Sequence, residues 1–254
     1  MSALTLRIIA ALTMLLDHIG YFSGCLPLRY IGRIAFPLYV FLMVNGFRYT
    51  KNRSRYALRF GVFAIVSQVP YVLLTGYPFL RLEHIPKLLT TPSVLVSNMN
   101  VMVTLLLALL AIWIGEVLRK KKFTRYLCLI PAFFLFCAYY YGLIRSDYGG
   151  KGVLLAVVFW LFSDHKLLTA VGVFGAMLYP SLMEYGLRLI KGLPLSAPNQ
   201  YQIMLLFSLL ALPFIWLYNQ KPGRLPQRPW AKKAVQLGFY AFYPLHLMVL
   251  WAIF

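Results

Sequence analysis

Apolar runs of membrane-spanning length recur along the chain, separated by short breaks that carry charged residues, Pro or Gly. Because a helix needs about 20 apolar residues to cross the hydrocarbon core of a bilayer, each run predicts a membrane helix. The run at 151–163 is too short to cross straight, so a broken or re-entrant element is the alternative there. The predicted helices are 3–22, 31–48, 56–76, 99–118, 126–143, 151–163, 166–185, 201–218 and 234–254.

The composition agrees with this pattern. Of 254 residues, 61% are hydrophobic and 12% are charged, which excludes an ordinary soluble globular domain. No linker or soluble insertion interrupts the runs, so we predict one transmembrane domain over 1–254. The first run lacks a small-residue cleavage site after it and is interpreted as a retained helix rather than a signal peptide. The predicted fold is an all-α integral membrane bundle of about nine spanning helices.

The basic residues cluster in the breaks after the second, fourth and eighth runs. These three breaks fall on one side of the membrane if nine helices alternate, and the excess of Lys and Arg makes that side cytoplasmic. The N-terminus is therefore predicted to be cytoplasmic. The clusters hold 15 of the 25 Lys and Arg residues: Arg48, Lys51, Arg53, Arg55 and Arg59; Arg119, Lys120, Lys121, Lys122 and Arg125; Lys221, Arg224, Arg228, Lys232 and Lys233.

The net charge of +19 has two explanations. Basic loops set topology and contact anionic lipid headgroups in most membrane proteins. The same loops can instead bind a polyanion such as a nucleotide cofactor, since Arg binds phosphate oxygens in bidentate fashion. Nucleic acid is a poor candidate partner because the chain shows no nucleic-acid-binding motif. The three cysteines show no paired spacing, so neither a disulfide framework nor a zinc site is expected, and no metal is predicted.

Polar residues within the apolar runs or, for Asp147, at the outer end of the fifth run are the candidates for chemistry. A carboxylate at membrane depth costs roughly 2.5–3.5 kcal/mol, so such a group indicates a functional site by default. With the N-terminus inside, several of these groups fall in the outer half of the membrane, where apolar surroundings favour mutual pairing in an internal cavity. They are Asp17, His18, Arg33, Asn100, Asp147 and His246.

Asp17 and His18 point roughly 100° apart on a helix, so they cannot both aim at one point. Either residue can pair instead with Arg33 or His246. Histidine is suited to proton transfer near neutral pH, and a carboxylate can fix its tautomer. An Asp–Arg pair that holds helices together, or a proton relay in a transporter, uses the same residue types. Position alone leaves an enzyme, a transporter and a structural pair open.

Ordered sequence strings add information at this point. They are DHIG at 17–20, the IGRIAFP string from 31 to 37, GFRYTKNRSRYALR from 46 to 59, SQVP at 67–70, NVMVTL from 100, YNQKPG from 218 and FYPLHL from 242. Together they resemble the TraX family, membrane proteins named for the conjugal-transfer pilin acetylase. The resemblance runs from residue 4 to residue 250 in the same order, except at 77–97 and 163–200. Two departures are Asn45, where an acidic residue is expected, and Gln220, where a small residue is commoner.

The resemblance implies N-acetyl transfer from acetyl-CoA, as co-substrate, to an amine acceptor such as a peptide N-terminus, in the cytoplasmic membrane of a bacterium. His18 is the predicted general base with Asp17 or Asp147 orienting it, and His246 is its competitor. Arg33 or Asn100 is expected to stabilise the oxyanion. The residues expected at the CoA site are Arg48, Tyr49, Arg53, Arg59, Asn219, Lys221, Gly223 and Arg224, and those of the acceptor cavity are Asn45, Gln68, Tyr240 and Tyr243.

The acceptor and the acyl chain length do not follow from this pattern. A proton-coupled transporter or flippase that uses Asp17, His18 and His246 is the alternative function. An O-acyltransferase of the same architecture is the other.

Overall fold

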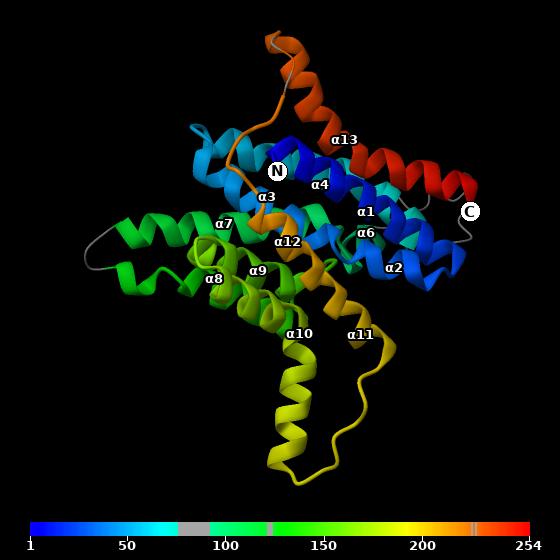
Figure 1. Cartoon of the computed structure of the whole chain (residues 1–254), viewed down its shortest axis with the longest axis vertical. Helices are drawn as coiled ribbons and strands as arrows, with labels where there is room; N and C mark the ends of the chain where they lie inside the picture. Colours follow the sequence, from blue (N-terminus) through cyan, green and yellow to red (C-terminus); the bar gives the residue numbers. More distant parts are fainter. Residues whose placement is uncertain (76–91, 121–123, 225, 227) are drawn as a thin grey trace. The chain divides into compact units, whose positions relative to one another are not determined.

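The computed structural model describes residues 1–75, 92–120, 124–224, 226 and 228–254 (Figure 1). Over these residues the regular elements are helices, and an isolated bridge joins Met99 to Ser146. The all-helical prediction is therefore confirmed. Lys121 and Lys122 of the second basic cluster lie outside the described residues.

The helices, in chain order, are α1 (Ala3–Ser23), α2 (Leu26–Gly32), α3 (Ala35–Tyr49), α4 (Arg53–Thr75), α6 (Pro92–Ser97), α7 (Val101–Lys120), η2 (Arg125–Leu127), α8 (Ile130–Tyr140), α9 (Gly149–Phe162), α10 (Lys166–Ile190), α11 (Gln200–Leu206), η3 (Phe207–Leu210), α12 (Ala211–Trp216) and α13 (Pro229–Ile253).

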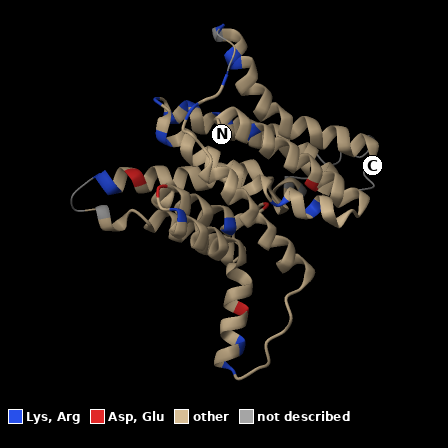
Figure 2. Ribbon diagram, in the orientation of Figure 1, with Lys and Arg blue, Asp and Glu red and all other residues tan. Residues whose placement is uncertain are grey.

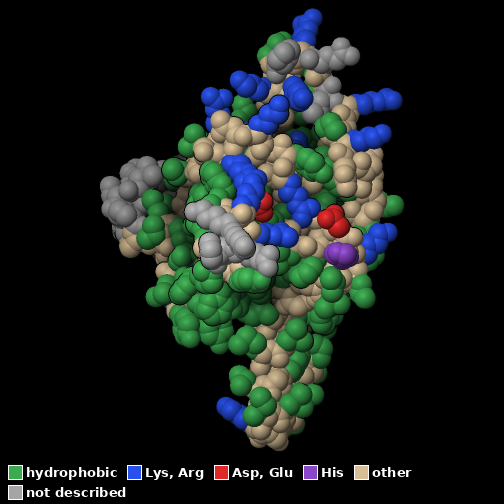
Figure 3. Space-filling model, turned by 90° about the vertical axis from the view of Figure 1, so that its left-hand side faces the viewer, with side chains coloured by type: hydrophobic (Ala, Val, Ile, Leu, Met, Phe, Trp, Pro, Cys, Tyr) green, Lys and Arg blue, Asp and Glu red, His purple; other side chains and the backbone are tan. Residues whose placement is uncertain are grey.

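Six helical stretches of the described chain are long and apolar enough to cross a membrane. They are α1, the α2–α3 stretch Leu26–Tyr49, α4, α7, α10 and Trp230–Ile253 of α13. Charged side chains are sparse along these helices and gather near their ends (Figure 2). Large apolar side chains of α10, among them Leu167, Phe174 and Leu187, are exposed, as expected for contact with lipid. Figure 3 shows hydrophobic side chains on the surface of the molecule well away from most of its Lys and Arg. The chain is thus a multi-pass membrane protein, while nine crossings and a cytoplasmic N-terminus stay predictions.

Three shorter apolar helical stretches fall on the remaining predicted runs: α8, α9 and Gln200–Trp216. The run predicted at 126–143 forms a helix only over the 11 residues of α8, because η2 precedes it and Pro131 lies in the first turn. Eleven residues span about 16 Å, roughly half of a bilayer core. Asp147 consequently lies in the connection between α8 and α9 rather than at a helix end.

Two other predicted helices are interrupted. The helix expected at 31–48 begins earlier, at Leu26, and breaks at Arg33 and Ile34 before α3 starts. The helix expected at 201–218 changes to the 3₁₀ turn η3 ahead of Pro213. Pro213 has no N–H to donate to a carbonyl of the preceding turn, so a regular α-helix does not continue through this point.

The described chain forms two compact units. Unit 1 comprises Met1–Leu42 and Val158–Arg224, and unit 2 comprises Met43–Val157 and Leu225–Phe254. Each unit joins two stretches that are far apart in sequence, and a single domain over 1–254 stays a prediction. In unit 1 the core includes Leu6, Leu38, Phe159, Val173 and Met177. In unit 2, α4 packs against α7 and α13, and the core includes Phe47, Leu73, Leu109, Leu155 and Leu247.

Candidate functional site

Two glycines let α1 and α2 pack closely in unit 1. A Cβ added to Gly20 would lie 2.8 Å from the carbonyl oxygen of Cys25 and 2.8 Å from the Cβ of Leu28. A Cβ added to Gly32 would lie 2.5 Å from the Cα of Asp17 and 2.7 Å from its Oδ1. Since real Cβ atoms are not found this close to other heavy atoms, only glycine permits this approach. The contact brings the end of α2 directly against Asp17.

The close approach allows a buried ion pair. Nη2 of Arg33 donates to Oδ1 and Oδ2 of Asp17, at 2.5 and 2.6 Å. Nε of Arg29 lies 3.5 Å from the same Oδ1. The exposed fractions of the three side chains are 17% for Asp17, 7% for Arg33 and 18% for Arg29. Two guanidinium groups thus face one carboxylate, and the cluster carries one excess positive charge.

His18 follows Asp17 on α1, and its ring contacts the helix backbone. Nδ1 lies 2.9 Å from the carbonyl oxygen of Met14. A carbonyl oxygen only accepts, so Nδ1 carries the proton and, in the neutral ring, Nε2 keeps its lone pair. The Met14 carbonyl therefore holds the tautomer, a role that the sequence had given to Asp17 or Asp147. Nε2 of the neutral ring is a proton acceptor.

His246 in unit 2 adopts the same local arrangement. Its Nδ1 lies 2.8 Å from the carbonyl oxygen of Phe242, and its ring stacks on the Phe242 ring at 5.0 Å between centroids. Tyr243 packs on the ring at 5.7 Å, and the His246 residue is 5% exposed. In both predicted histidines the basic nitrogen of the neutral ring is thus Nε2, and the choice between them stays open.

Asn100 and Gln68, both predicted site residues, form an amide network in unit 2. Nδ2 of Asn100 donates to the Ala64 carbonyl oxygen and to Oε1 of Gln68, both at 2.7 Å. Oδ1 of Asn100 accepts from the backbone N–H of Met102 at 3.0 Å, which caps α7. Both amide N–H bonds of the fully buried Asn100 are therefore used within the fold. An oxyanion would have to displace one of these partners.

Three further predicted residues also lie in unit 2: Asp147 between α8 and α9, and Tyr240 and Tyr243 on α13. The backbone N–H of Asp147 donates to Met99, and its carbonyl oxygen accepts from Thr104 Oγ1. Tyr240 stacks on the Phe63 ring, with centroids 5.3 Å apart. Tyr243 is 2% exposed. These residues have packing roles that explain their position, and an acceptor-binding role for them is untested.

The basic segment between α3 and α4 also lies in unit 2. The guanidinium of Arg53 lies 4.3 Å from the Phe47 ring centroid, and that of Arg59 lies 5.7 Å from the Tyr56 ring centroid. Tyr56 in turn donates its hydroxyl to the Met43 carbonyl oxygen at 3.0 Å. Stacking on a ring occupies the guanidinium face and orients its N–H edge. The neighbouring predicted residues Asn45, Arg48 and Tyr49 end α3.

Residues 219–223, part of the expected CoA site, form backbone hydrogen bonds with the start of the chain in unit 1. The backbone N–H of Ala3 donates to Lys221 at 2.8 Å, and Asn219 donates to Met1 at 2.9 Å. Gly223 has φ +92°, and a Cβ there would lie 2.6 Å from Ser2 Oγ. Packing against residues 1–4 thus accounts for this glycine, while the side chains of Lys221 and Arg224 are exposed.

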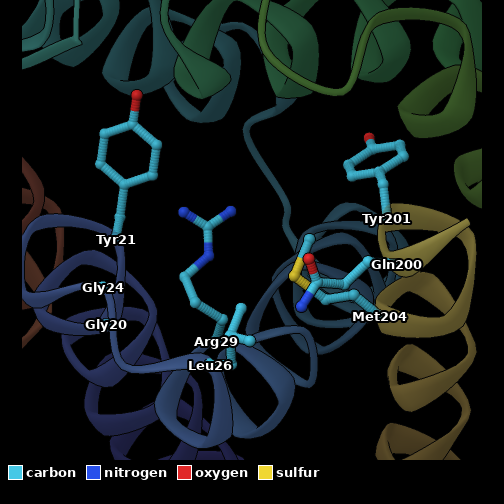
Figure 4. Close-up of a pocket in the computed structure, with 8 residues that line it drawn as sticks. All are labelled: Gly20, Tyr21, Gly24, Leu26, Arg29, Gln200, Tyr201 and Met204. Carbon is cyan, nitrogen blue, oxygen red and sulfur yellow. The ribbon is translucent and has the colours of Figure 1, made fainter.

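The sequence analysis missed a pocket of about 220 Å³ in unit 1 (Figure 4). It opens between the end of α1, the start of α2 and the start of α11. Arg29 belongs to none of the three basic clusters, and residues 163–200 lay outside the family motifs, so no sequence pattern singled out this site. Its lining consists of Gly20, Tyr21, Gly24, Leu26, Arg29, Gln200, Tyr201 and Met204. Across the described ranges, no group of three or more His, Cys, Asp or Glu could hold a metal ion.

Comparison with known proteins identifies the family. Residues 2–254 match the family model described as TraX protein. The chain belongs to the TraX family. A probable fimbrial assembly protein FimC, serogroup H1, from Dichelobacter nodosus is 28% identical over 261 residues, covering 98% of this chain and 94% of that protein. No solved structure matches the chain. The sequence resemblance is thus confirmed, and it extends over the stretches that the motifs left uncovered.

Substitution of Gly32 by Ala tests the α1–α2 packing in this TraX protein. The added Cβ would push α2 away from Asp17, so we expect Gly32→Ala to destabilise the protein by about 1–3 kcal/mol. Gly175→Ala is the matched control, because a Cβ at Gly175 meets nothing within 4 Å. Thermal unfolding in detergent checks both variants. Equal stability of the two would contradict the packing account.

The amide network gives a second stability test. Asn100→Asp replaces two N–H donors by a carboxylate that faces two oxygens at 2.7 Å. We expect a loss of about 2–5 kcal/mol, as for two buried acceptors without donors. Asn98→Asp is the control, because exposed Asn98 donates to the Tyr71 hydroxyl, which can itself donate to a carboxylate. A denaturation midpoint that is unchanged in Asn100→Asp would show that the network does not stabilise unit 2.

Proposed function

We propose that this protein is an integral-membrane N-acetyltransferase, which moves an acetyl group from cytosolic acetyl-CoA to an amine acceptor. The TraX family is associated with pilin acetylation, and the FimC relative is named for fimbrial assembly. The observation that carries the proposal is the state of His18, which follows Asp17 on α1: Nδ1 is bonded to the Met14 carbonyl, so Nε2 of the neutral ring is the nitrogen that accepts a proton.

The reaction needs a base and an oxyanion donor. The amine nitrogen attacks the thioester carbonyl carbon while Nε2 of His18 takes the amine proton. The C–S bond then breaks, and the CoA thiolate leaves and receives that proton. General-base catalysis contributes about 10²–10⁴-fold, and one oxyanion donor contributes about 3–4 kcal/mol. Arg33 is the better donor candidate, since both N–H bonds of the Asn100 amide are already used.

The CoA phosphates are assigned to the basic loops. The guanidinium groups of Arg53 and Arg59 lie over aromatic rings, and Nε of Arg59 donates to the Arg55 carbonyl oxygen. The proposal assigns phosphate contacts to their terminal nitrogens. Arg48 and Tyr49 of the same segment complete this set in unit 2. Lys221 and Arg224, which the sequence predicted for CoA as well, are exposed in unit 1. Nine crossings with a cytoplasmic N-terminus put these loops on the cytoplasmic side and the ends of α1 and α2 on the outer side. In this proposal the acceptor amine enters the site from the outer side of the membrane.

His18→Ala tests the assignment of the base. We expect transfer to fall by at least about 100-fold while acetyl-CoA binding is retained, because the ring acts on the amine and not on the nucleotide. Product formation is measured by mass spectrometry on purified protein in detergent, and binding by calorimetry. His246→Ala is the comparison variant. Retained transfer in His18→Ala together with its loss in His246→Ala would move the role to His246.

Charge reversal tests the CoA loops. Arg53→Glu should weaken acetyl-CoA binding by at least about tenfold, since it replaces a phosphate contact by a repulsive charge. Lys51→Glu makes the same charge change in the same segment and should have a smaller effect, limited to the screened long-range field. Equal affinities for the two variants would remove Arg53 from the binding site. If the wild type does not bind CoA, and if a pH gradient drives uptake of a solute into proteoliposomes that contain it, a transporter would be favoured.

A further inference from the structure

The pocket at Arg29 has the chemistry of an anion site. Figure 4 shows the Arg29 guanidinium extending into the space between Tyr21 and Tyr201. The guanidinium carbon lies 4.8 Å from the Tyr21 ring centroid. Gln200 and Met204 line the side that α11 contributes, and Gly24, at φ +69°, leaves open space where a side chain would stand. A cation with orienting aromatic and amide groups around it is typical of recognition of a small anionic group.

The positive charge of Arg29 is only partly neutralised, because Arg29 shares the single carboxylate of Asp17 with Arg33. Both oxygens of Asp17 accept from Nη2 of Arg33, and its Oδ1 lies 3.5 Å from Nε of Arg29. That Nε is buried and makes no hydrogen bond. A partly desolvated guanidinium whose Nε–H lacks a hydrogen-bond partner is unfavourable, so an anion that enters the pocket gains charge-assisted bonds.

We propose that this pocket binds a carboxylate or phosphate group carried by the amine acceptor. The inference rests on the proposed acetyltransferase function and names the chemical class of its acceptor. The volume of about 220 Å³ is below that of a pocket for a whole drug-sized ligand, and it fits one anionic group of a larger molecule. The polyphosphate of CoA is assigned elsewhere, because a single guanidinium does not match several phosphate charges.

The pocket also has a defined relation to the proposed base. Tyr21 lies three residues after His18 on α1, so the two side chains are neighbours on the helix surface. Arg29, through Asp17, belongs to the same charged cluster. The proposal places the amine of an acceptor whose anionic group sits at Arg29 on the His18 side of α1. Arg29 positions the acceptor and takes no part in proton transfer.

Matched acceptors test this inference. The probes are alanine-based tetrapeptide amides with a free N-terminus and one glutamate at each position in turn, with their glutamine counterparts, and phosphoethanolamine with ethanolamine. Binding is measured first without acetyl-CoA, and transfer is then measured by mass spectrometry. We expect at least one acidic probe to bind about tenfold to 100-fold more tightly than its neutral partner, the range of a charge-assisted hydrogen bond.

Variants connect this preference to the pocket. Arg29→Gln should lower the acid-to-neutral ratio to about one, and Arg29→Lys should retain part of it, since a lysine keeps the charge without the fork. Lys191→Gln removes one positive charge from an exposed position of the same unit and should keep the full ratio. Gly24→Asp adds a competing carboxylate and should lower the ratio more than Gly24→Asn; Asn and Asp both tolerate the left-handed conformation.

The outcomes separate the two proposals. Equal binding of every acidic and neutral pair, or a ratio that survives in Arg29→Gln, would overturn the pocket assignment even if acetyl transfer occurs. An acid preference in binding that depends on Arg29, with no acetylation of any amine, would support the anion site and contradict the acetyltransferase function. Loss of affinity for phosphatidylglycerol nanodiscs in Arg29→Gln, without any acceptor preference, would make the pocket a lipid site and the proposal wrong.

Discussion

The contact between Asp17 and Arg33 is the interaction on which the candidate site depends. A carboxylate in an apolar helix is costly unless it is paired, and the pair forms only because Gly20 and Gly32 let α1 and α2 approach closely. Once Arg33 holds both oxygens of Asp17, the second guanidinium at Arg29 is left with a 3.5 Å contact through Nε. The pair thereby fixes the α1 turn that carries His18 and leaves one positive charge beside the pocket.

The two histidines are prepared for proton transfer in the same way. In each, Nδ1 donates to the carbonyl oxygen four residues earlier on its own helix, at 2.9 Å for His18 and 2.8 Å for His246. The backbone therefore sets the tautomer, and no carboxylate is required for it. What distinguishes them is the surroundings: His18 adjoins a charged cluster, whereas His246 packs between Phe242 and Tyr243. This difference favours His18 for chemistry on a charged substrate.

Much of the fold could be predicted from the sequence, because the apolar runs are long and the bilayer length constraint is strict. Asn100 stood out in the sequence as a polar residue at membrane depth, and its side chain caps α7 and pairs with Gln68. Its oxyanion role stays a prediction. The break at Arg33 and the short α8 were not predicted, because they depend on tertiary contacts and on Pro131. Arg29 could not be distinguished from a topology-setting charge, since its distance to Asp17 appears only when α2 folds back on α1. Nor could the sequence show that Gly223 packs against Ser2, since the two residues meet only in the folded chain.

The most direct test of the account is an acetyl-transfer assay with the purified wild-type protein in proteoliposomes. Acetyl-CoA and a free-amine peptide are supplied, and released CoA thiol and acetylated peptide are counted together. We expect CoA to be released in a one-to-one ratio with acetylated amine, and only when the acceptor is present. Folded protein that binds acetyl-CoA without acceptor-dependent thiol release, or that does not bind it at all, would contradict the central claim.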